Sequence, residues 1–223
     1  MLDIMIKHNL KAKKEGKTED ILDEKSIVGN VCFFYLAGYN TSVDSMTSGL
    51  TFIAERPDWV KRCVDEGLKS PQEILNNKSL ECLIKEILRL CPPIPLAIPR
   101  KIMKDCEVDG IKLWKGDNVT WPHGGYSMDS EYFDEPLKFI PERFLDEEKL
   151  AKNPKQANIP FSLGKRSCLG KELAYNEVRI FIGSLLREYE IKTPENYVRN
   201  YVLSWGYRVA NAFVDAKLRE KVY

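Results

Sequence analysis

The sequence has little of what metal cages and disulfide-stapled proteins are built from. It contains two histidines, His8 and His123, and none of its six cysteines forms a C-x-x-C pair. Zinc cages use closely spaced Cys and His ligands, so the composition argues against one. Four of the cysteines lie in apolar helical or proline-bounded stretches. This pattern predicts buried, reduced thiols in a reducing compartment.

Excess charge of one sign and long apolar runs are missing as well. The formal net charge is +1 over 223 residues, which gives no electrostatic case for nucleic-acid binding. The longest apolar run, residues 31–38, is far shorter than the ~20 residues that span a bilayer. The first residues turn basic after a short apolar run and predict neither a signal peptide nor an anchor. The localisation of the chain itself stays open.

The patterns that are present predict a mainly helical protein with small β-sheets (α+β). Helical spacing predicts a long helix over about residues 20–55 and another over about 79–91, with a loop over 69–78 between them. In a β-rich part over about 95–121, short strands are predicted over 100–104, 107–108 and 119–121, with turns at 109–110 and 115–117. A hairpin is predicted over about 191–223. The length suits one domain with a core of its own.

The chain is organised around the ten residues that end at Gly170, FSLGKRSCLG. Cys168 lies just before an amphipathic helix, where free backbone N–H groups and the helix dipole favour a thiolate. Gly164 and Gly170 leave room for a flat group. Phe161 offers an apolar face, and Arg166 offers a cation that can pair with a carboxylate. These properties are typical of the proximal side of a haem site, although a buried structural thiol is the alternative.

The pattern F-x-x-G-x-R-x-C-x-G resembles the haem-thiolate signature of the cytochrome P450 family. It departs from that signature at Ser162, where the family most often has glycine. The resemblance implies the C-terminal half of the cytochrome P450 fold, as a single partial domain over residues 1–223. It implies that Cys168, in the loop over residues 160–170, is the axial ligand of haem b. The general resemblance is to the eukaryotic microsomal type, whose full-length members lie on the cytoplasmic face of the endoplasmic reticulum membrane.

A second motif, AGYNTS, lies in the middle of the long predicted helix. Gly38 leaves clearance, and Thr41 offers a hydroxyl that can bond back to its own helix. The motif resembles the family's oxygen-activation segment, which implies that Thr41 assists oxygen activation beside a small apolar substrate near Ala37. Asn40 stands where the family has an acid, and an amide cannot relay a proton as a carboxylate does. Helix packing is the alternative reason for these small and polar residues.

Glu86 and Arg89 share one face of the helix predicted over 79–91, because they are three residues apart. Most such pairs are exposed and contribute ~0–1 kcal/mol. This pair resembles the family's E-x-x-R, and Arg143 in the PERF stretch matches the family's third partner. The resemblance implies a buried ion network with a structural role, which holds the cysteine loop.

Further basic residues complete the expected site. The resemblance implies that Arg100 and Arg166 neutralise the haem carboxylates, whereas a strand-end surface position is the alternative for Arg100. Lys165, Arg166 and Lys171 cluster beside the cysteine. They form either a solvated rim or a docking patch for an electron-donor protein, through which NADPH electrons arrive from a reductase. His123 is expected to be a packed or surface histidine, not a metal ligand.

Together the motifs predict a haem-dependent monooxygenase that inserts one oxygen atom of O2 into an apolar organic substrate. The alternatives are a non-catalytic haem-binding remnant and a haem-thiolate peroxygenase or isomerase, for which Asn40 is one reason. Family members carry further helices before the long one. We therefore expect this chain to be a fragment or a truncated form that binds haem weakly on its own.

Overall fold

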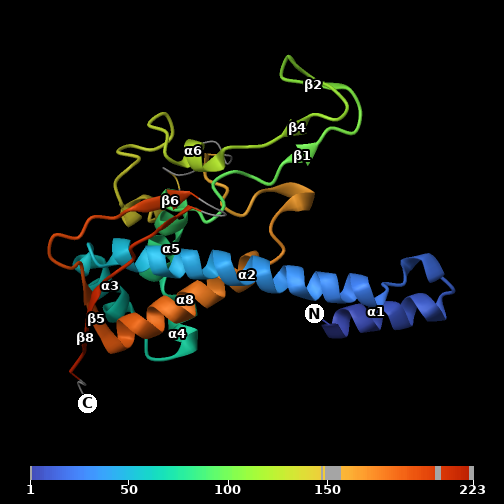
Figure 1. Ribbon diagram of the computed structural model, residues 1–223. Coiled ribbons are helices and arrows are strands. Elements are labelled where there is room, and N and C mark those ends of the chain that lie inside the picture. Colours follow the sequence, from blue (N-terminus) through green and yellow to red (C-terminus); the bar gives the residue numbers. More distant parts are fainter. Residues whose placement is uncertain (1, 147, 149–156, 204–206, 221–223) are drawn as a thin grey trace. The chain divides into compact units, whose positions relative to one another are not determined.

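The computed structural model describes residues 2–146, 148, 157–203 and 207–220 (Figure 1). Its contacts divide the chain into two units, residues 1–41 and 42–223, and each is described by itself. The boundary falls within the long helix α2, Glu24–Ile53. This helix starts where the carboxylate of Asp23 accepts a hydrogen bond of 2.7 Å from the backbone N–H of Ser26. An acid at this position satisfies one of the free N–H groups of the first turn.

The first unit consists of two antiparallel helices, and a polar side chain holds the connection between them in place. It holds α1, Leu2–Lys14, a short 3-10 turn, Thr18–Asp20, and the first part of α2. The amide of Asn9 donates to the carbonyl of Leu22 at 2.8 Å and accepts from its N–H at 2.9 Å. These two bonds fix the return of the chain between the helices.

The second unit is built on a core of helices. They are α3 (Pro57–Glu66), α4 (Pro71–Asn76), α5 (Lys78–Leu90) and α8 (Lys171–Glu188), together with the end of α2. Apolar side chains that are fully buried fill the space between them, including Ile53, Leu80, Leu83, Ile182 and Leu186. Helix α8 approaches α4 closely, because a Cβ atom at Gly183 would lie 2.6 Å from Cγ2 of Ile74.

Helix α4 is a correction to the sequence analysis, which predicts a loop over residues 69–78. Pro71 starts the helix at a position where proline is tolerated, and the hydroxyl of Ser70 accepts a hydrogen bond of 3.2 Å from the N–H of Glu73. With six residues, the helix is too short to show a clear apolar periodicity. The sequence therefore indicates this helix through its capping residues and not through an apolar periodicity.

The β-rich part consists of two-stranded ladders. Strand β1, Arg100–Lys101, pairs antiparallel with β4, Asn118–Val119, and β2, Cys106–Val108, pairs with β3, Ile111–Leu113. The turn between β2 and β3 has positive φ at both Asp109 and Gly110, +48° and +80°. Such turns match the twist of a two-residue hairpin. This turn is predicted from the sequence, whereas β3 is not among the predicted strands.

Two further ladders lie in the C-terminal part. Strand β6, Tyr201–Leu203, pairs with β7, Tyr207–Val209, inside the stretch where a hairpin is expected. Trp205, which the same expectation includes, lies outside the described residues. Strand β8, Asp215–Leu218, returns to pair with β5, Tyr189–Lys192, directly after α8. Among the described helices, none combines the length and apolarity needed to cross a bilayer.

The cysteines divide by environment. Cys63, Cys82 and Cys91 are buried, as the apolar patterns around them predict. Burial raises the pKa of the Cys91 thiol to about 11. Cys32 is exposed on α2, so the prediction of a buried thiol is wrong for this residue.

Candidate functional site

The cysteine loop is a short, hydrogen-bonded turn that ends at α8. The N–H of Cys168 donates to the carbonyl of Phe161 at 2.8 Å, and the N–H of Ser167 donates to the carbonyl of Gly164 at 3.1 Å. Gly164 has φ +70°, and it opens the 3-10 turn Gly164–Arg166. The loop is therefore closed by its own backbone just before the helix begins at Lys171.

Ser162 adopts a left-handed conformation in this loop, with φ +59°. Side chains other than those of Gly, Asn and Asp are unfavourable there, because the Cβ atom crowds the backbone. This is the position at which the sequence departs from the expected glycine. The backbone thus explains why a glycine suits the position and shows that serine is accommodated with some strain.

Cys168 is exposed, and three leucines close to it in the sequence are exposed as well. The side chains of Leu163, Leu169 and Leu173 are 52%, 82% and 63% exposed. Exposed leucines occur singly on most proteins, but three of them flanking one exposed cysteine mark a surface suited to an apolar ligand. The ring of Phe161 is half-buried and packs on Tyr175 at 5.0 Å. Phe161 therefore contacts α8 as well as bordering the loop.

The two expected carboxylate partners are both exposed cations. Arg166 lies in the 3-10 turn of the loop, and Arg100 lies on β1. Arg100 donates from Nη1 to the carbonyl of Ile98 at 2.9 Å. Within the described part of the chain, neither arginine is ion-paired with a carboxylate. Both therefore keep charge that an anionic ligand could neutralise.

The expected ion network is present and buried. Arg89 and Glu86 are fully buried on α5, and two hydrogen bonds of 2.7 Å join the guanidinium to both carboxylate oxygens. Arg143 lies in the 3-10 helix η2, Pro141–Phe144, and its Nε is 3.3 Å from Oε1 of Glu86. The N–H of Ile140 also donates to Oε1 of Glu86 at 2.9 Å. Every charge in this group thus has a partner, which is the condition for a stable buried ion pair.

Arg89 also holds irregular backbone in place. Its guanidinium donates to the carbonyls of Ser127, Pro136 and Lys138 at 2.7, 2.6 and 3.1 Å. The hydroxyl of Ser127 returns a hydrogen bond of 2.8 Å to the carbonyl of Arg89. Ser127, which ends the short helix α6 (His123–Ser127), is a contributor that the sequence analysis misses, since no spacing rule links it to the glutamate–arginine pair.

A second group of hydrogen bonds, made by Glu142, holds the 3-10 helix η2 against the start of α3. Both carboxylate oxygens of Glu142, in η2, accept from Arg56, and Oε1 also accepts from Trp59 Nε1 at 2.8 Å. The hydrogen bond from Arg56 holds the pKa of the Glu142 carboxyl below its usual value. Asp58 shares the same guanidinium at 2.8 Å. The PERF stretch is therefore bound on two sides, by Arg143 to α5 and by Glu142 to the start of α3.

The AGYNTS residues lie on α2. The hydroxyl of Thr41 donates to the carbonyl of Ala37 at 2.7 Å, which is the expected back-bond to its own helix. A Cβ atom added at Gly38 would meet no atom within 4 Å. Gly38, Asn40 and Thr41 belong to the unit of residues 1–41, whereas Cys168 belongs to the other unit. Their place opposite the cysteine stays a prediction.

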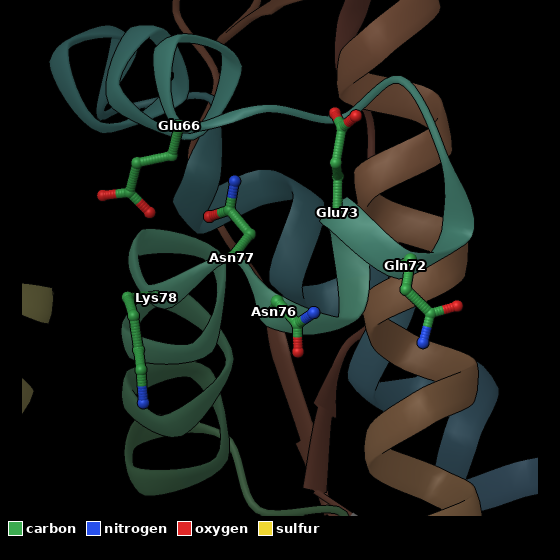
Figure 2. A pocket seen from close by; sticks show the side chains of 6 residues that line it. All are labelled: Glu66, Gln72, Glu73, Asn76, Asn77 and Lys78. Atoms are coloured by element: carbon green, nitrogen blue, oxygen red, sulfur yellow. The ribbon is translucent and has the colours of Figure 1, made fainter.

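A surface pocket of about 480 Å³ is lined by residues of α3, α4 and the start of α5 (Figure 2). Figure 2 shows Glu66 on α3 and Glu73 on α4 among its lining side chains. Both acids are already used, because Glu66 accepts from Ser79 N at 2.9 Å and Glu73 accepts from Lys69 N at 2.8 Å. The pocket holds none of the residues that the sequence analysis selects.

The comparisons with known proteins decide the family. A sequence profile described as cytochrome P450 matches residues 1–207. The chain belongs to the cytochrome P450 family. It is 33% identical over 207 residues to cytochrome P450 76A1 of Solanum melongena and 31% identical over 204 residues to cytochrome P450 4V2 of Rattus norvegicus. These alignments cover 88% and 87% of the chain.

The fold agrees with this assignment. A crystal structure of a cytochrome P450, CYP102L1, superposes with a TM-score of 0.81 at 24% sequence identity, over 90% of this chain and 47% of that one. The chain spans 43% and 37% of the length of the two curated relatives. The predicted fold class, mainly helical with small sheets in a cytochrome P450 arrangement, is confirmed.

The cysteine loop of this cytochrome P450 chain suits haem as a ligand. Among the residues that the structure describes, no three His, Cys, Asp or Glu side chains gather to hold a metal ion. A bare ion needs several protein donors, whereas haem brings four ring nitrogens and needs one axial donor. The exposed Cys168, its leucine neighbours, and Arg100 and Arg166, which have no carboxylate partner among the described residues, fit a flat, apolar ligand with carboxylates at one edge.

Proposed function

We propose that this chain carries the cysteine part of a haem-thiolate monooxygenase, with Cys168 as the axial ligand of haem b. The proposal rests chiefly on one observation: an exposed cysteine with exposed leucines beside it in the sequence, just before α8, in a chain of the cytochrome P450 family. When bound, haem would supply the activation of O2 and the insertion of one oxygen atom into a small apolar substrate, with electrons from NADPH through a partner reductase.

The loop residues position the thiolate and the carboxylates. The bond from Cys168 N to the carbonyl of Phe161 fixes the backbone that carries the thiol, and Gly164 and Gly170 leave the loop without Cβ atoms at two positions. Arg100 and Arg166 would pair with the carboxylates of haem. The Glu86 network would hold the surrounding backbone without contact to the reacting atoms.

The α2 residues would serve the oxygen side. Thr41 Oγ1 is the atom at which a proton would be held, and Gly38 leaves space beside it for substrate near Ala37. Asn40 can donate and accept hydrogen bonds but does not ionise near neutral pH. Proton delivery would therefore depend on the hydroxyl of Thr41 and on water, not on an acid at position 40.

The basic residues of the loop would receive an acidic electron-donor protein. Lys165, Arg166 and Lys171 are exposed, and no described carboxylate is ion-paired with any of them. Such a patch speeds association with a negatively charged partner. The full-length protein would work at the cytoplasmic face of the endoplasmic reticulum membrane.

The test is reconstitution of the full 223-residue chain with haem, followed by reduction and addition of CO. We expect the red-shifted absorption band of a haem-thiolate in the wild type and in Cys106→Ala, which removes another exposed thiol. The band should be lost in Cys168→Ser. An unchanged band in Cys168→Ser would contradict the proposal.

Asn40 favours a second candidate, a haem-thiolate enzyme that uses peroxide or rearranges its substrate. Because no acid stands at this position, reaction with O2 and reductase should be inefficient compared with reaction with hydrogen peroxide. Turnover driven by NADPH and reductase, compared with turnover driven by peroxide, separates the two candidates. A haem band without turnover under either condition would support a non-catalytic haem-binding remnant.

A further inference from the structure

A hydrogen bond joins the helix that follows the cysteine loop to the last residue of the AGYNTS motif. The hydroxyl of Ser42 on α2 donates to Oε2 of Glu177 on α8 at 2.9 Å. Both residues belong to the second unit, although they are 135 positions apart in the sequence. Ser42 is 7% exposed, whereas Glu177 is exposed. The bond therefore runs from a buried hydroxyl of α2 to a carboxylate at the surface of α8.

Ser42 is the residue at which α2 enters the second unit. Further along α2, the hydroxyl of Ser48 accepts a hydrogen bond of 3.0 Å from the N–H of Val209. Gly49 packs tightly on α5, because a Cβ atom there would lie 2.8 Å from Cδ1 of Ile87. These contacts hold α2 beyond its first turns in the unit, whereas the bond to Glu177 holds the helix where it enters.

The surroundings of Glu177 on its own helix leave its carboxylate to Ser42. The residues three and four positions from it along α8 are uncharged: Leu173, Ala174, Ile180 and Phe181. Residues at these spacings are the ones with which a helical carboxylate forms ion pairs. A hydrogen bond to an ionised carboxylate is also stronger than one between neutral groups. No ion pair within α8 therefore competes with the bond from Ser42.

The two partners are close in the chain to the two halves of the proposed site. Glu177 lies six residues after Lys171, the start of α8, which is roughly 9 Å along the helix axis. Ser42 follows Thr41 directly within α2, so the two side chains leave the helix about 100° apart. A bond that fixes the rotation of α2 at Ser42 therefore also fixes the direction in which the side chain of Thr41 leaves the helix.

We propose that Glu177 is a positioning residue for the oxygen side of the haem site. By accepting the hydrogen bond from Ser42, it fixes the rotation of α2 against α8 and so directs the hydroxyl of Thr41 toward haem bound at Cys168. The inference rests on the proposed function, because it requires haem at Cys168 and a role for Thr41. Glu177 acts through Ser42 and Thr41 and does not touch haem or substrate.

The experiment measures the infrared stretching band of CO in the reduced CO complex of the full chain with haem. This band responds to hydroxyl groups near the CO, so Thr41→Val should shift it. Ser42→Ala removes the donor and Glu177→Leu removes the acceptor, and both should shift the band in the same direction as Thr41→Val. Glu177→Gln keeps an acceptor oxygen and should leave the band at its wild-type position. Glu172→Leu, at another exposed acid of α8, is the matched control and should not shift it.

Combination with Thr41→Val shows whether Glu177 acts through Thr41. In that background, Ser42→Ala and Glu177→Leu should cause no further shift, because the hydroxyl that they position is gone. A purely structural bond would disturb the haem site whether or not the hydroxyl is present. A further shift of the same size in the Thr41→Val background would therefore overturn the inference. An unshifted band in both Ser42→Ala and Glu177→Leu would overturn it as well.

Haem affinity separates positioning from a role in folding. Alanine is favourable within helices, and the freed carboxylate of Glu177 can be hydrated, so the haem affinity of Ser42→Ala should stay within about threefold of the wild type. A loss of about tenfold or more would overturn the inference in favour of a structural role. If Glu177→Leu fails to fold, Ser42→Ala supplies the same comparison. A wild type without a haem-thiolate band, or an unshifted CO band in Thr41→Val, would instead overturn the proposed function.

Discussion

The polar groups of the ion network on α5 are buried and paired, whereas the cysteine of the loop before α8 is exposed. Glu86 and Arg89 are completely buried, and the Glu86 carboxylate meets two arginines and a backbone N–H. Cys168 is exposed, and its leucine neighbours face outward. The network is complete within the chain, so it stabilises the fold. The loop is complete only when something covers it, which is what a binding site requires.

The largest effect should come from breaking the network. Arg89→Ala leaves the Glu86 carboxylate buried beside a partner at 3.3 Å and frees three backbone carbonyls. We expect a loss of ~3–5 kcal/mol in the free energy of unfolding. Urea denaturation measures it. Lys85→Ala, at a charged residue of the same helix that pairs with the partly buried Glu81, is the control and should cost below ~1 kcal/mol. A loss in Arg89→Ala as small as in the control would remove the contrast between network and loop.

Thiol labelling should reproduce the contrast without any mutation. Cys82 is buried on the network's helix, whereas Cys168 and Cys106 are exposed. Burial raises the pKa of Cys82, so less of the reactive thiolate is present. A maleimide should modify Cys168 and Cys106 on the order of 100-fold faster than Cys82. Addition of haem should then protect Cys168 and leave Cys106 reactive. Labelling of Cys82 at the same rate as Cys168 would contradict the difference in burial.

Loss of the hydrogen bonds that Glu142 makes should have a smaller, pH-dependent effect. The hydrogen bond from Arg56 lowers the pKa of Glu142 in the folded state, so its stabilisation is complete above the unfolded value of about 4.3. It is lost as the pH falls through the lowered pKa. Because the carboxylate is partly exposed, Glu142→Gln should cost ~0.5–1 kcal/mol at pH 7 and less at pH 3. Urea denaturation at both pH values measures this. A larger cost of Glu142→Gln at pH 3 than at pH 7 would contradict this prediction.

The smallest effect should come from the strain in the cysteine loop. Ser162 has φ +59°, a region in which glycine has no Cβ penalty. Ser162→Gly should stabilise the chain by ~0.5 kcal/mol, since the relieved strain is partly offset by the greater freedom of glycine in the unfolded chain. Ser167→Gly, in the same loop, is the control and should not stabilise. Thermal unfolding measures both, and an equal gain in the two variants would argue against strain at Ser162.

The sequence predicts the elements that show an apolar periodicity or that match a known motif. The long helix, the helix of Glu86 and Arg89, and their link to Arg143 are all present. Strand β3 and helix α4 escape prediction because each is too short to show a period. Their signals are local, in the Asp-Gly turn and the Ser-Pro cap, and such signals fix a turn or a start more firmly than the element that follows.

The partners of Arg89 and Glu142 could not be predicted from the sequence, for a different reason. No rule of spacing leads from Glu142 to Arg56 or from Arg89 to Lys138, because these contacts join segments through irregular chain. The hydrogen bond from Ser42 to Glu177 could not be predicted either, since its partners are 135 residues apart on two different helices. Exposure of Cys168, in contrast, is consistent with its place between two glycines before a helix.

The hydrogen bonds from Arg89 to backbone carbonyls have a consequence for how the sequence of the segment they hold can evolve. Every amino acid brings the same carbonyl group, so the anchoring of Pro136 and Lys138 places no demand on the chemistry of their side chains. Substitutions along that stretch can accumulate while its path is kept, provided the new residues tolerate the local backbone angles. A single guanidinium can thus hold the shape of a segment whose sequence is free to diversify.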